Sequence, residues 1–365
     1  MEPAAHLLHL VSANTWGGVE RYALDICRHF HREGWHVTVA TRDAKAVDKA
    51  FEKESIPLLH APFGGMNDPA SVFTLVNFMK KQPTDCPVIV HAHSFSNAFT
   101  ALLARKIAHR KDIKVVMTRH KVKRALDTWI LRRIYRNLDS IIFVSSLAMN
   151  RFLSTWRSQE YPFPPQRLRV IHNSLNIPAP KILTRSEKGP TTAMFHGPLL
   201  PGKGLETLID AMAILKGTRL RLKIVGNGSP DYVDRLRQRA ITRDVMSSID
   251  WHRHSDNPME LIQDCDFGVL PSQREEAFGL ANIEYMACGR PIVCTSNGAQ
   301  PEYITDGKEA FLIPPGNPVA LAEAMRNLAS NTNLRQRMGQ RAFETFVEKL
   351  SWQNFISHLS SVYLS

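Results

Sequence analysis

Short apolar runs alternate along the whole chain with apolar residues at helical spacing. The first run, His6–Val11, is strand-like, and the next apolar residues recur on one helix face: Val19, Tyr22, Ala23, Ile26, Cys27 and Phe30. Gly34 ends this helix, and a second strand is predicted over 36–41. Further short apolar runs lie at 88–90, 114–117, 141–144 and 168–171. Strands that alternate with helices are typical of a parallel sheet with covering helices.

The stretch Pro178–Pro190 is polar and contains several prolines, which is typical of a linker. The alternation then starts again, with strands predicted over 192–195, 220–225, 267–270 and 291–294 and helices over 205–215, 280–288, 319–328 and 334–346. We therefore predict an α/β protein with two Rossmann-like parallel-sheet domains, over 1–178 and 191–348. A C-terminal helix over 351–365 is expected to pack back on the first domain.

Ligands bind at the carboxyl ends of the strands in such sheets, so each glycine-bearing turn after a strand is a candidate site. Gly17 and Gly18 open the first helix and let the backbone approach a phosphate, although a tight turn would also use them. Gly197–Gly204 opens another helix, and Lys203 there either neutralises a diphosphate or is simply solvated. Neither turn has the spacing of a dinucleotide fingerprint or a P-loop.

The turn Pro271–Glu284 is the most informative. Phe278 and Gly279 begin a helix whose first amides can bind an anion, and an acid lies on either side of them. One acid suits the hydroxyls of a sugar, and the other suits those of a ribose. The alternatives are a helix-entry charge for Glu276 and a surface position for Glu284, but the apolar neighbours of Glu284 favour a function.

These motifs together resemble the family 4 retaining glycosyltransferases, also called glycosyl transferases group 1. The resemblance covers nearly the whole chain and rests on six segments in the family order: Gly17–Glu20, Val170–Ser174, Lys203–Gly204, the Glu-x7-Glu spacing of Glu276 and Glu284, Glu284–Pro291 and Gly298–Glu302. It implies the GT-B fold, in which two Rossmann-like domains face each other across a cleft.

The resemblance also implies roles for single residues. Glu276, His120 and Lys203 would be catalytic: Glu276 contacts the transferred sugar, and His120 lies beside it. The donor would be bound by the residues Gly17, Gly18, Lys203, Gly226, Asn227, Phe278, Gly279, Leu280 and Glu284. No cofactor or metal is expected, and we interpret the Asp-x-Asp stretch at 264–266 as structural. One departure is Pro198, where the family has an arginine that shares the diphosphate; His196, Arg119 or Arg21 could replace it.

The chain has a formal net charge of +12, and its excess of basic residues lies in the first half. Residues 105–136 contain 12 Lys and Arg against Asp112 and Asp127. Apolar side chains accompany them: Leu126, Trp129, Ile130, Ile134 and Leu138. This pattern suits a helix on an anionic membrane surface, although a core-facing helix with a solvated basic face would look the same.

We expect a cytoplasmic protein, at most peripheral to the cytoplasmic face of the inner membrane. No apolar run reaches the ~18 residues that span a bilayer, and we interpret Leu7–Val11 as a buried strand rather than a signal peptide. Five cysteines without a Cys-x-x-Cys pair favour a reducing compartment.

The predicted activity is the transfer of a sugar from a nucleotide-diphosphate sugar to a hydroxyl of a saccharide or lipid-linked acceptor, in the synthesis of lipopolysaccharide or another cell-surface glycan. A GT-B-fold epimerase or phosphorylase would share the architecture, but the Glu-x7-Glu spacing disfavours the epimerase. A nucleic-acid-binding protein would explain the basic half and leave the two acids without a purpose, so nucleic acid is not an expected partner.

Overall fold

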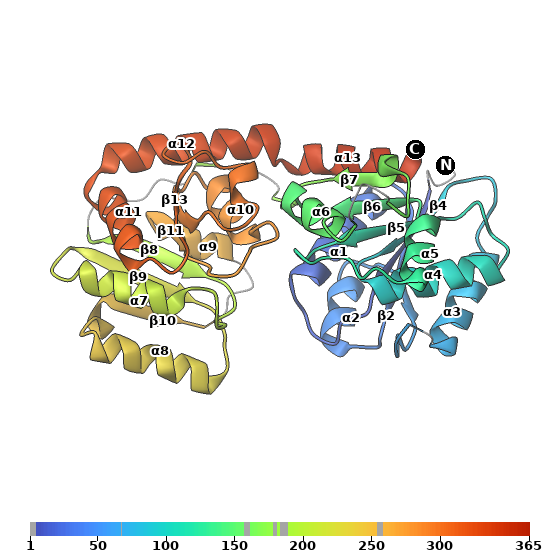
Figure 1. Ribbon diagram of the computed structural model, residues 1–365, viewed down its shortest axis with the longest axis horizontal. Coiled ribbons are helices and arrows are strands. Elements are labelled where there is room, and N and C mark those ends of the chain that lie inside the picture. The colour runs from blue at the N-terminus through green and yellow to red at the C-terminus, as the bar shows by residue number, and fades with distance from the viewer. Residues whose placement is uncertain (1–4, 67, 157–160, 178–180, 183–188, 254–257) are drawn as a thin grey trace. The chain divides into compact units, whose positions relative to one another are not determined.

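The computed structural model describes residues 5–66, 68–156, 161–177, 181–182, 189–253 and 258–365, which form two compact units (Figure 1). The described residues of Met1–His172 and Phe355–Ser365 form the first unit, and those of Asn173–Asn354 form the second. Most of the predicted linker, 178–190, lies outside the described residues. The fold class is confirmed, because each unit is built on a parallel sheet with helices around it.

The first unit contains a seven-stranded parallel sheet with the order β3-β2-β1-β4-β5-β6-β7. Its strands are β1 (His6–Val11), β2 (His36–Thr41), β3 (Leu58–His60), β4 (Val88–Ala92), β5 (Lys114–Arg119), β6 (Ser140–Phe143) and β7 (Leu168–Val170). Its helices are α1 (Gly18–Arg32), α2 (Lys45–Glu52), α3 (Pro69–Lys80), α4 (Phe95–Ile107), α5 (Trp129–Asn137), α6 (Ser146–Leu153), the 3-10 turn η2 (Pro165–Arg167) and most of α13 (Trp352–Leu364).

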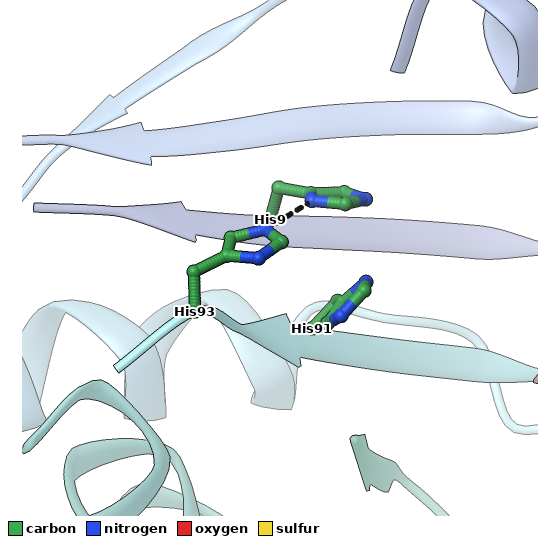
Figure 2. Close-up of side chains that lie close together, drawn as sticks. All are labelled: His9, His91 and His93. Atoms are coloured by element: carbon green, nitrogen blue, oxygen red, sulfur yellow. Dashed lines mark hydrogen bonds between the residues drawn. The ribbon is translucent and has the colours of Figure 1, made fainter. Parts of the chain in front are cut away.

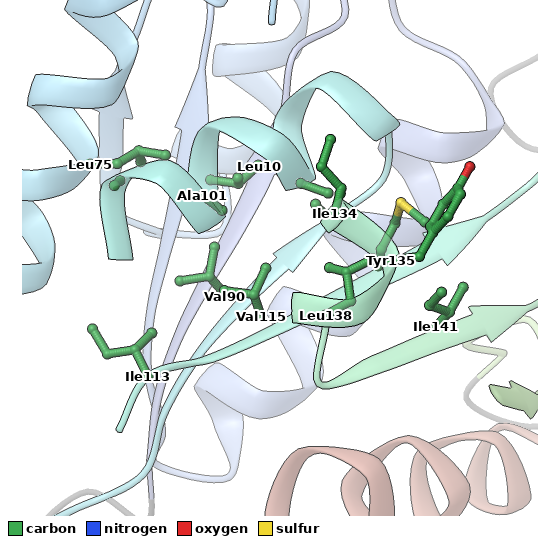
Figure 3. Close-up of a cluster of buried hydrophobic side chains, with 14 of the residues drawn as sticks. Leu10, Leu75, Val90, Ala101, Ile113, Val115, Ile134, Tyr135, Leu138 and Ile141 are labelled. Carbon is green, nitrogen blue, oxygen red and sulfur yellow. The ribbon is translucent and has the colours of Figure 1, made fainter. Parts of the chain in front are cut away.

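Alternate residues of the central strands point to opposite faces of this sheet, so each face has its own partners. One face packs Leu10, Val90 and Val115 against Leu75 of α3 and Ala101 of α4 (Figure 3). The other face carries His9 of β1 next to His91 of β4 in the sheet register. It is covered by α1 and α13, since Tyr363 contacts His91 there.

The second unit contains a six-stranded parallel sheet with the order β10-β9-β8-β11-β12-β13. Its strands are β8 (Thr191–His196), β9 (Leu220–Val225), β10 (Ile249–His252), β11 (Phe267–Leu270), β12 (Ile292–Thr295) and β13 (Ala310–Ile313). Its helices are α7 (Leu205–Ile214), α8 (Pro230–Thr242), α9 (Pro258–Gln263), α10 (Leu280–Ala287), α11 (Pro318–Ser330) and α12 (Thr332–Lys349), with 3-10 turns η3 (Met246–Ser248) and η4 (Gln300–Glu302).

Among the described residues, no helix is both long enough and apolar enough to cross a bilayer. None of the five cysteines, all of which lie in described parts of the chain, forms a disulfide, and Cys27, Cys265, Cys288 and Cys294 are buried. Small apolar side chains are frequent at such positions, so these four thiols act as packing groups.

Candidate functional site

The start of α10 lies at the carboxyl edge of the second sheet, directly after the loop that follows β11. Gly279 caps the helix in the left-handed region with φ of +89°, and a Cβ there would lie 2.7 Å from the Asn282 side-chain nitrogen. The preceding Phe278 is buried, and its carbonyl accepts a 2.6 Å hydrogen bond from the Tyr303 hydroxyl. Only glycine fits this turn, which leaves Gly279 and Leu280 partly exposed where the first helical N–H groups point outward.

Lys203 and Glu276 meet at this edge although 73 positions separate them in the chain. Lys203 Nζ lies 2.5 Å from Glu276 Oε1, and both side chains remain partly exposed. The turn that carries Lys203 docks on the loop after β11, because Gln273 N–H donates to the Gly202 carbonyl at 2.8 Å. A Cβ on Gly204 would lie 1.8 Å from the Pro271 carbonyl oxygen, so the close approach of the two loops requires glycine.

Glu284 is buried on α10, with 4% of its surface exposed, and contacts His196 at the end of β8. His196 Nε2 lies 2.5 Å from Glu284 Oε2, and His196 Nδ1 lies 2.9 Å from the Tyr285 hydroxyl. The Tyr285 hydroxyl donates its one proton to the Met194 carbonyl at 2.8 Å, so it accepts from His196 Nδ1–H. A proton must therefore also lie between His196 Nε2 and Glu284.

Gly226 and Asn227, which the resemblance assigns to donor binding, lie at the same edge. Gly197 N–H donates to the Val225 carbonyl and Leu199 N–H to the Asn227 carbonyl, so the turn after β9 runs beside the turn after β8. Gly226 is buried there, and Asn227 is exposed. Pro198, at the position of the family arginine, is exposed, and both ring nitrogens of His196 already have partners within the unit.

In the first unit, Gly17 and Gly18 are exposed at the start of α1. The Glu20 carboxylate lies in the first turn of that helix and faces the N–H groups of Gly17 and of Glu20 itself. Burial raises the pKa of Glu20, and the two N–H groups oppose that rise. The carboxylate thereby satisfies donors that the helix start would otherwise leave without a partner.

His120 follows β5 and lines a cavity of about 380 Å³ at the carboxyl edge of the first sheet. His93 Nδ1 lies 3.2 Å from His120 Nε2, and His9 Nδ1 lies 2.9 Å from His93 Nε2. Burial lowers the pKa of His120 to about 4, with Lys121 adding to the effect, and lowers the pKa of His9 to about 3. These imidazoles are therefore neutral near pH 7. Together with His93 they form one hydrogen-bonded chain of three histidines.

The end of this histidine chain at His9 indicates which ring nitrogen of each histidine carries its proton. His9 Nε2 is buried and has no hydrogen-bond partner among the described residues. A lone pair without a partner costs less there than an N–H without one, so His9 carries its proton on Nδ1 and donates to His93. His93 then donates from Nδ1 to His120 Nε2, which leaves the proton of His120 on Nδ1. His120 thus offers an N–H donor.

His9, His91 and His93 also form a group of potential metal ligands, with ligand atoms within 4.8 Å of one another (Figure 2). The rings of His9 and His93 are stacked and the ring of His91 is tilted against both, with centroids 4.5–5.1 Å apart. His91 Nδ1 lies 2.6 Å from the Tyr363 hydroxyl and His91 Nε2 lies 2.7 Å from the Thr118 hydroxyl. Both nitrogens of His91 therefore serve hydrogen bonds, and the group fits a buried polar network better than a metal site.

Comparison with known proteins identifies the family. The profile of glycosyl transferases group 1 matches residues 181–345, and that of glycosyltransferase family 4 matches residues 16–177. The chain belongs to the family 4 glycosyltransferases. An uncharacterized glycosyltransferase of Methanocaldococcus jannaschii is 30% identical over 199 residues, which cover 54% of this chain and 53% of the relative. The chain spans about half the length of the curated relatives it matches.

Solved structures share the architecture of this chain. Anabaena HepE in complex with UDP and glucose is similar with a TM-score of 0.81 and 20% identity, covering 98% of this chain and 99% of that one. The lipopolysaccharide outer core galactosyltransferase WaaB in its apo form has a TM-score of 0.76 and 17% identity, covering 99% of each chain. At these identities the likeness shows the fold.

Two groups of residues escaped the sequence prediction. The first is the histidine chain behind His120, whose only signal was the His-x-His spacing of His91 and His93 at a strand end. The second is the pairing of Glu284 with His196, which arises because β8 and β11 are neighbours in the sheet and α10 packs against β11. Neither contact is visible from local spacing.

The predicted apolar face of the basic segment divides in two. Ile134 and Leu138 are buried in the core of the first unit, with 4% and 0% exposed. Leu126 and Trp129 are 72% and 75% exposed, and Ile130 is 40% exposed. The α5 region therefore packs on the core with one side and offers an apolar patch, Leu126, Trp129 and Ile130, on the other.

Proposed function

We propose that this protein transfers a sugar from a nucleotide-diphosphate sugar to a hydroxyl of a saccharide or lipid-linked acceptor, with retention of anomeric configuration. The observation that carries the proposal is the pairing of Lys203 with Glu276 beside the glycine-capped start of α10. A cation, a helix start and an acid at one sheet edge suit a ligand with a diphosphate and hydroxyl groups.

The donor roles follow from these groups. The N–H groups of Gly279 and Leu280, with Lys203, would hold the diphosphate, and Glu276 would accept hydrogen bonds from the sugar. Glu284 would bind the ribose, with its carboxylate oriented by His196. HepE binds UDP and UDP-glucose on the same fold, which supports a nucleotide sugar as donor. The predicted contribution of Gly17, Gly18, Gly226 and Asn227 rests on the family resemblance.

The chemistry depends on charge stabilisation. As the bond between the sugar carbon and the phosphate oxygen breaks, negative charge grows on the diphosphate and positive charge on the sugar. Preoriented N–H groups and Lys203 stabilise the leaving diphosphate without reorganisation. The acceptor oxygen forms the new bond on the same face, and its proton passes to the departing phosphate oxygen. His120 Nδ1–H would donate to a sugar hydroxyl, and no metal is required.

The acceptor side belongs to the first unit in this proposal. The patch of Leu126, Trp129 and Ile130 is flanked by the exposed basic residues Lys123, Arg124 and Arg133. Apolar side chains with basic neighbours suit the surface of an anionic membrane. WaaB acts on lipopolysaccharide according to its name, and we propose a lipid-linked acceptor of a cell-surface glycan here, at the cytoplasmic face of the inner membrane.

A thermal-shift screen with nucleotides and nucleotide sugars tests the donor assignment. A ligand bound only by the folded state at 100 times its Kd stabilises the protein by about 2.7 kcal/mol. We expect nucleotides with one of the bases to raise the melting temperature of the wild type, and we expect Lys203→Ala to reduce this shift. A screen in which no nucleoside diphosphate stabilises the protein would contradict the proposal. Product analysis with a labelled donor then separates transfer from epimerisation or phosphorolysis.

A further inference from the structure

The guanidinium of Arg119 lies at the wall of the first unit's cavity, without an anionic partner among the described residues. Arg119 ends β5, and its Cζ lies 4.7 Å from the centre of the Phe152 ring. Its Nη2 donates to the Lys123 carbonyl at 3.2 Å. Its Nε is buried and has no hydrogen-bond partner among the described residues, and no carboxylate of those residues pairs with it.

Three arginines near it in the sequence of the same unit are each paired with a carboxylate. Arg105 contacts Asp139 at 2.5 Å, Arg110 contacts Asp112 at 2.6 Å, and Arg132 contacts Asp127 at 2.6 Å. Burial lowers the pKa of Arg119, with a smaller opposing effect from Tyr135. A partly desolvated charge without a counter-ion is costly, and stacking on one aromatic ring offsets only part of that cost. A bound anion would supply the missing counter-ion.

The cavity around Arg119 has the size and charge of an anion site. Its volume of about 380 Å³ suits a small ligand. Lys121 and Lys123 also line it and are exposed, whereas Glu20 is its one carboxylate among the lining residues. Because Glu20 faces the N–H groups at the start of α1, its charge is partly compensated within the unit. The cations therefore dominate the cavity.

We propose that Arg119, with Lys121 and Lys123, binds a phosphate group of the acceptor saccharide beside His120. This inference rests on the proposed function, because it assigns the cavity to the acceptor. Three cations at one wall match a phosphate monoester better than a singly charged group. The bound phosphate could instead belong to the donor diphosphate, because Pro198 replaces the family arginine. The experiment below separates these two sources.

The experiment measures stabilisation by inorganic phosphate when the donor site is already filled. Melting temperatures are recorded with a saturating nucleoside diphosphate, chosen from UDP, GDP and ADP, while phosphate replaces chloride at constant ionic strength. The variants are Arg119→Gln, Arg119→Lys and, as a matched control, Arg124→Gln, because Arg124 is exposed and does not line the cavity. The same series is repeated with glucose 6-phosphate against glucose.

We expect phosphate and glucose 6-phosphate to raise the melting temperature of the wild type and of Arg124→Gln, and glucose to have no comparable effect. Arg119→Gln should weaken phosphate binding about tenfold or more, while Arg119→Lys keeps part of it. All variants should keep the nucleotide-induced shift, which reports correct folding and tests the proposed function separately.

Two results would overturn the inference. One is a full phosphate response in Arg119→Gln, which would place the anion elsewhere. The other is loss of the nucleotide-induced shift in Arg119→Gln with an unchanged phosphate response, which would assign the guanidinium to the donor diphosphate. A failure of every nucleotide to bind would count against the proposed function and would leave the phosphate comparison readable.

Discussion

His196 Nε2 lies 2.5 Å from Glu284 Oε2, and both side chains are buried in the second unit. The imidazole is held from its other side by the Tyr285 hydroxyl, which itself donates to a backbone carbonyl of β8. The carboxylate of Glu284 is therefore oriented by the sheet below it rather than by solvent. In the proposed enzyme this arrangement presets the acid that receives the ribose.

Replacing the acid of this pair should weaken donor binding more than it slows the reaction. We expect Glu284→Gln to raise the KM for the donor about tenfold, because a charged hydrogen bond to ribose is lost. A donor lacking the ribose 2′- or 3′-hydroxyl should bind the wild type worse and the variant no worse. If the deoxy donor lost the same factor in both proteins, Glu284 would not contact the ribose.

In this chain Pro198 stands where the family has an arginine that shares the diphosphate with the lysine at position 203. We expect Lys203→Ala to lower kcat/KM by about 10²–10³, as loss of a group that stabilises the leaving charge does. Lys216→Ala is the control, since Lys216 is exposed and pairs with Asp244. Steady-state kinetics measure the effect, and near-normal kcat/KM in Lys203→Ala would refute the role assigned to it.

The histidine chain predicts which polar substitution His120 tolerates. His120→Asn places an amide N–H near the position of Nδ1, whereas His120→Gln places it near Nε2. We therefore expect His120→Asn to keep about tenfold more activity than His120→Gln, the difference of one hydrogen bond to a substrate group. His93→Phe should lower kcat and leave the donor KM nearly unchanged. Equal loss in Asn and Gln variants would show that the proton position of His120 is unimportant.

The same histidines should make the protein acid-sensitive. The pKa of His9 is lowered to about 3 and that of His120 to about 4, both chiefly by burial, from an ordinary value of 6.5. At a pH between the folded and the ordinary pKa, the unfolded chain binds more protons than the folded protein does. The stability is therefore full above pH 6.5 and is lost as the pH falls toward 4. At pH 5 each such histidine lowers the free energy of unfolding by about 2 kcal/mol.

Urea unfolding at pH 7.5 and pH 5 measures this loss. His9→Phe removes one of the buried imidazoles. It should reduce the difference in the free energy of unfolding between the two pH values by about 2 kcal/mol, the contribution of one histidine. His358→Gln is a suitable control because His358 is exposed. A pH dependence that is the same in the wild type and in His9→Phe would mean that His9 does not resist protonation in the folded protein.

The exposed patch on the first unit predicts binding to anionic vesicles. Sedimentation with vesicles of phosphatidylglycerol and phosphatidylcholine should recover more protein than pure phosphatidylcholine vesicles do, with the difference shrinking as salt rises. The double variant Leu126→Ser/Trp129→Ser should abolish the difference. Ile241→Ser, which changes an exposed apolar residue of the second unit, should not. Equal recovery with both vesicle types would contradict the membrane assignment.

Periodicity predicted the architecture well where elements are long and strongly apolar, as in β1, α1 and β2. The three-residue strand β3 gave no comparable signal, because Leu58–His60 is too short for a pattern and is not fully buried. Ile134 and Trp129 looked alike in sequence, yet one faces the core and the other solvent. Only the packing of α5 on the sheet decides between them.

The candidate site was less accessible to prediction than the fold. Local spacing indicated the turns that carry Lys203, Glu276 and Gly279, since glycine and charge at a helix start are local signals. The contact of Glu276 with Lys203 and that of Glu284 with His196 depend on which strands are neighbours in the sheet. Arg119 was a sequence candidate to replace the family arginine, but its lack of an anionic partner among the described residues is visible only once every neighbour is placed.

A crystal structure of the protein with its nucleoside diphosphate tests the central claim most directly. We predict that the diphosphate lies against the N–H groups of Gly279 and Leu280 with Lys203 beside it, and that the ribose hydroxyls contact Glu284. A nucleotide bound away from the start of α10, or a Glu284 carboxylate that keeps only His196 as its partner while the ribose points elsewhere, would contradict the account.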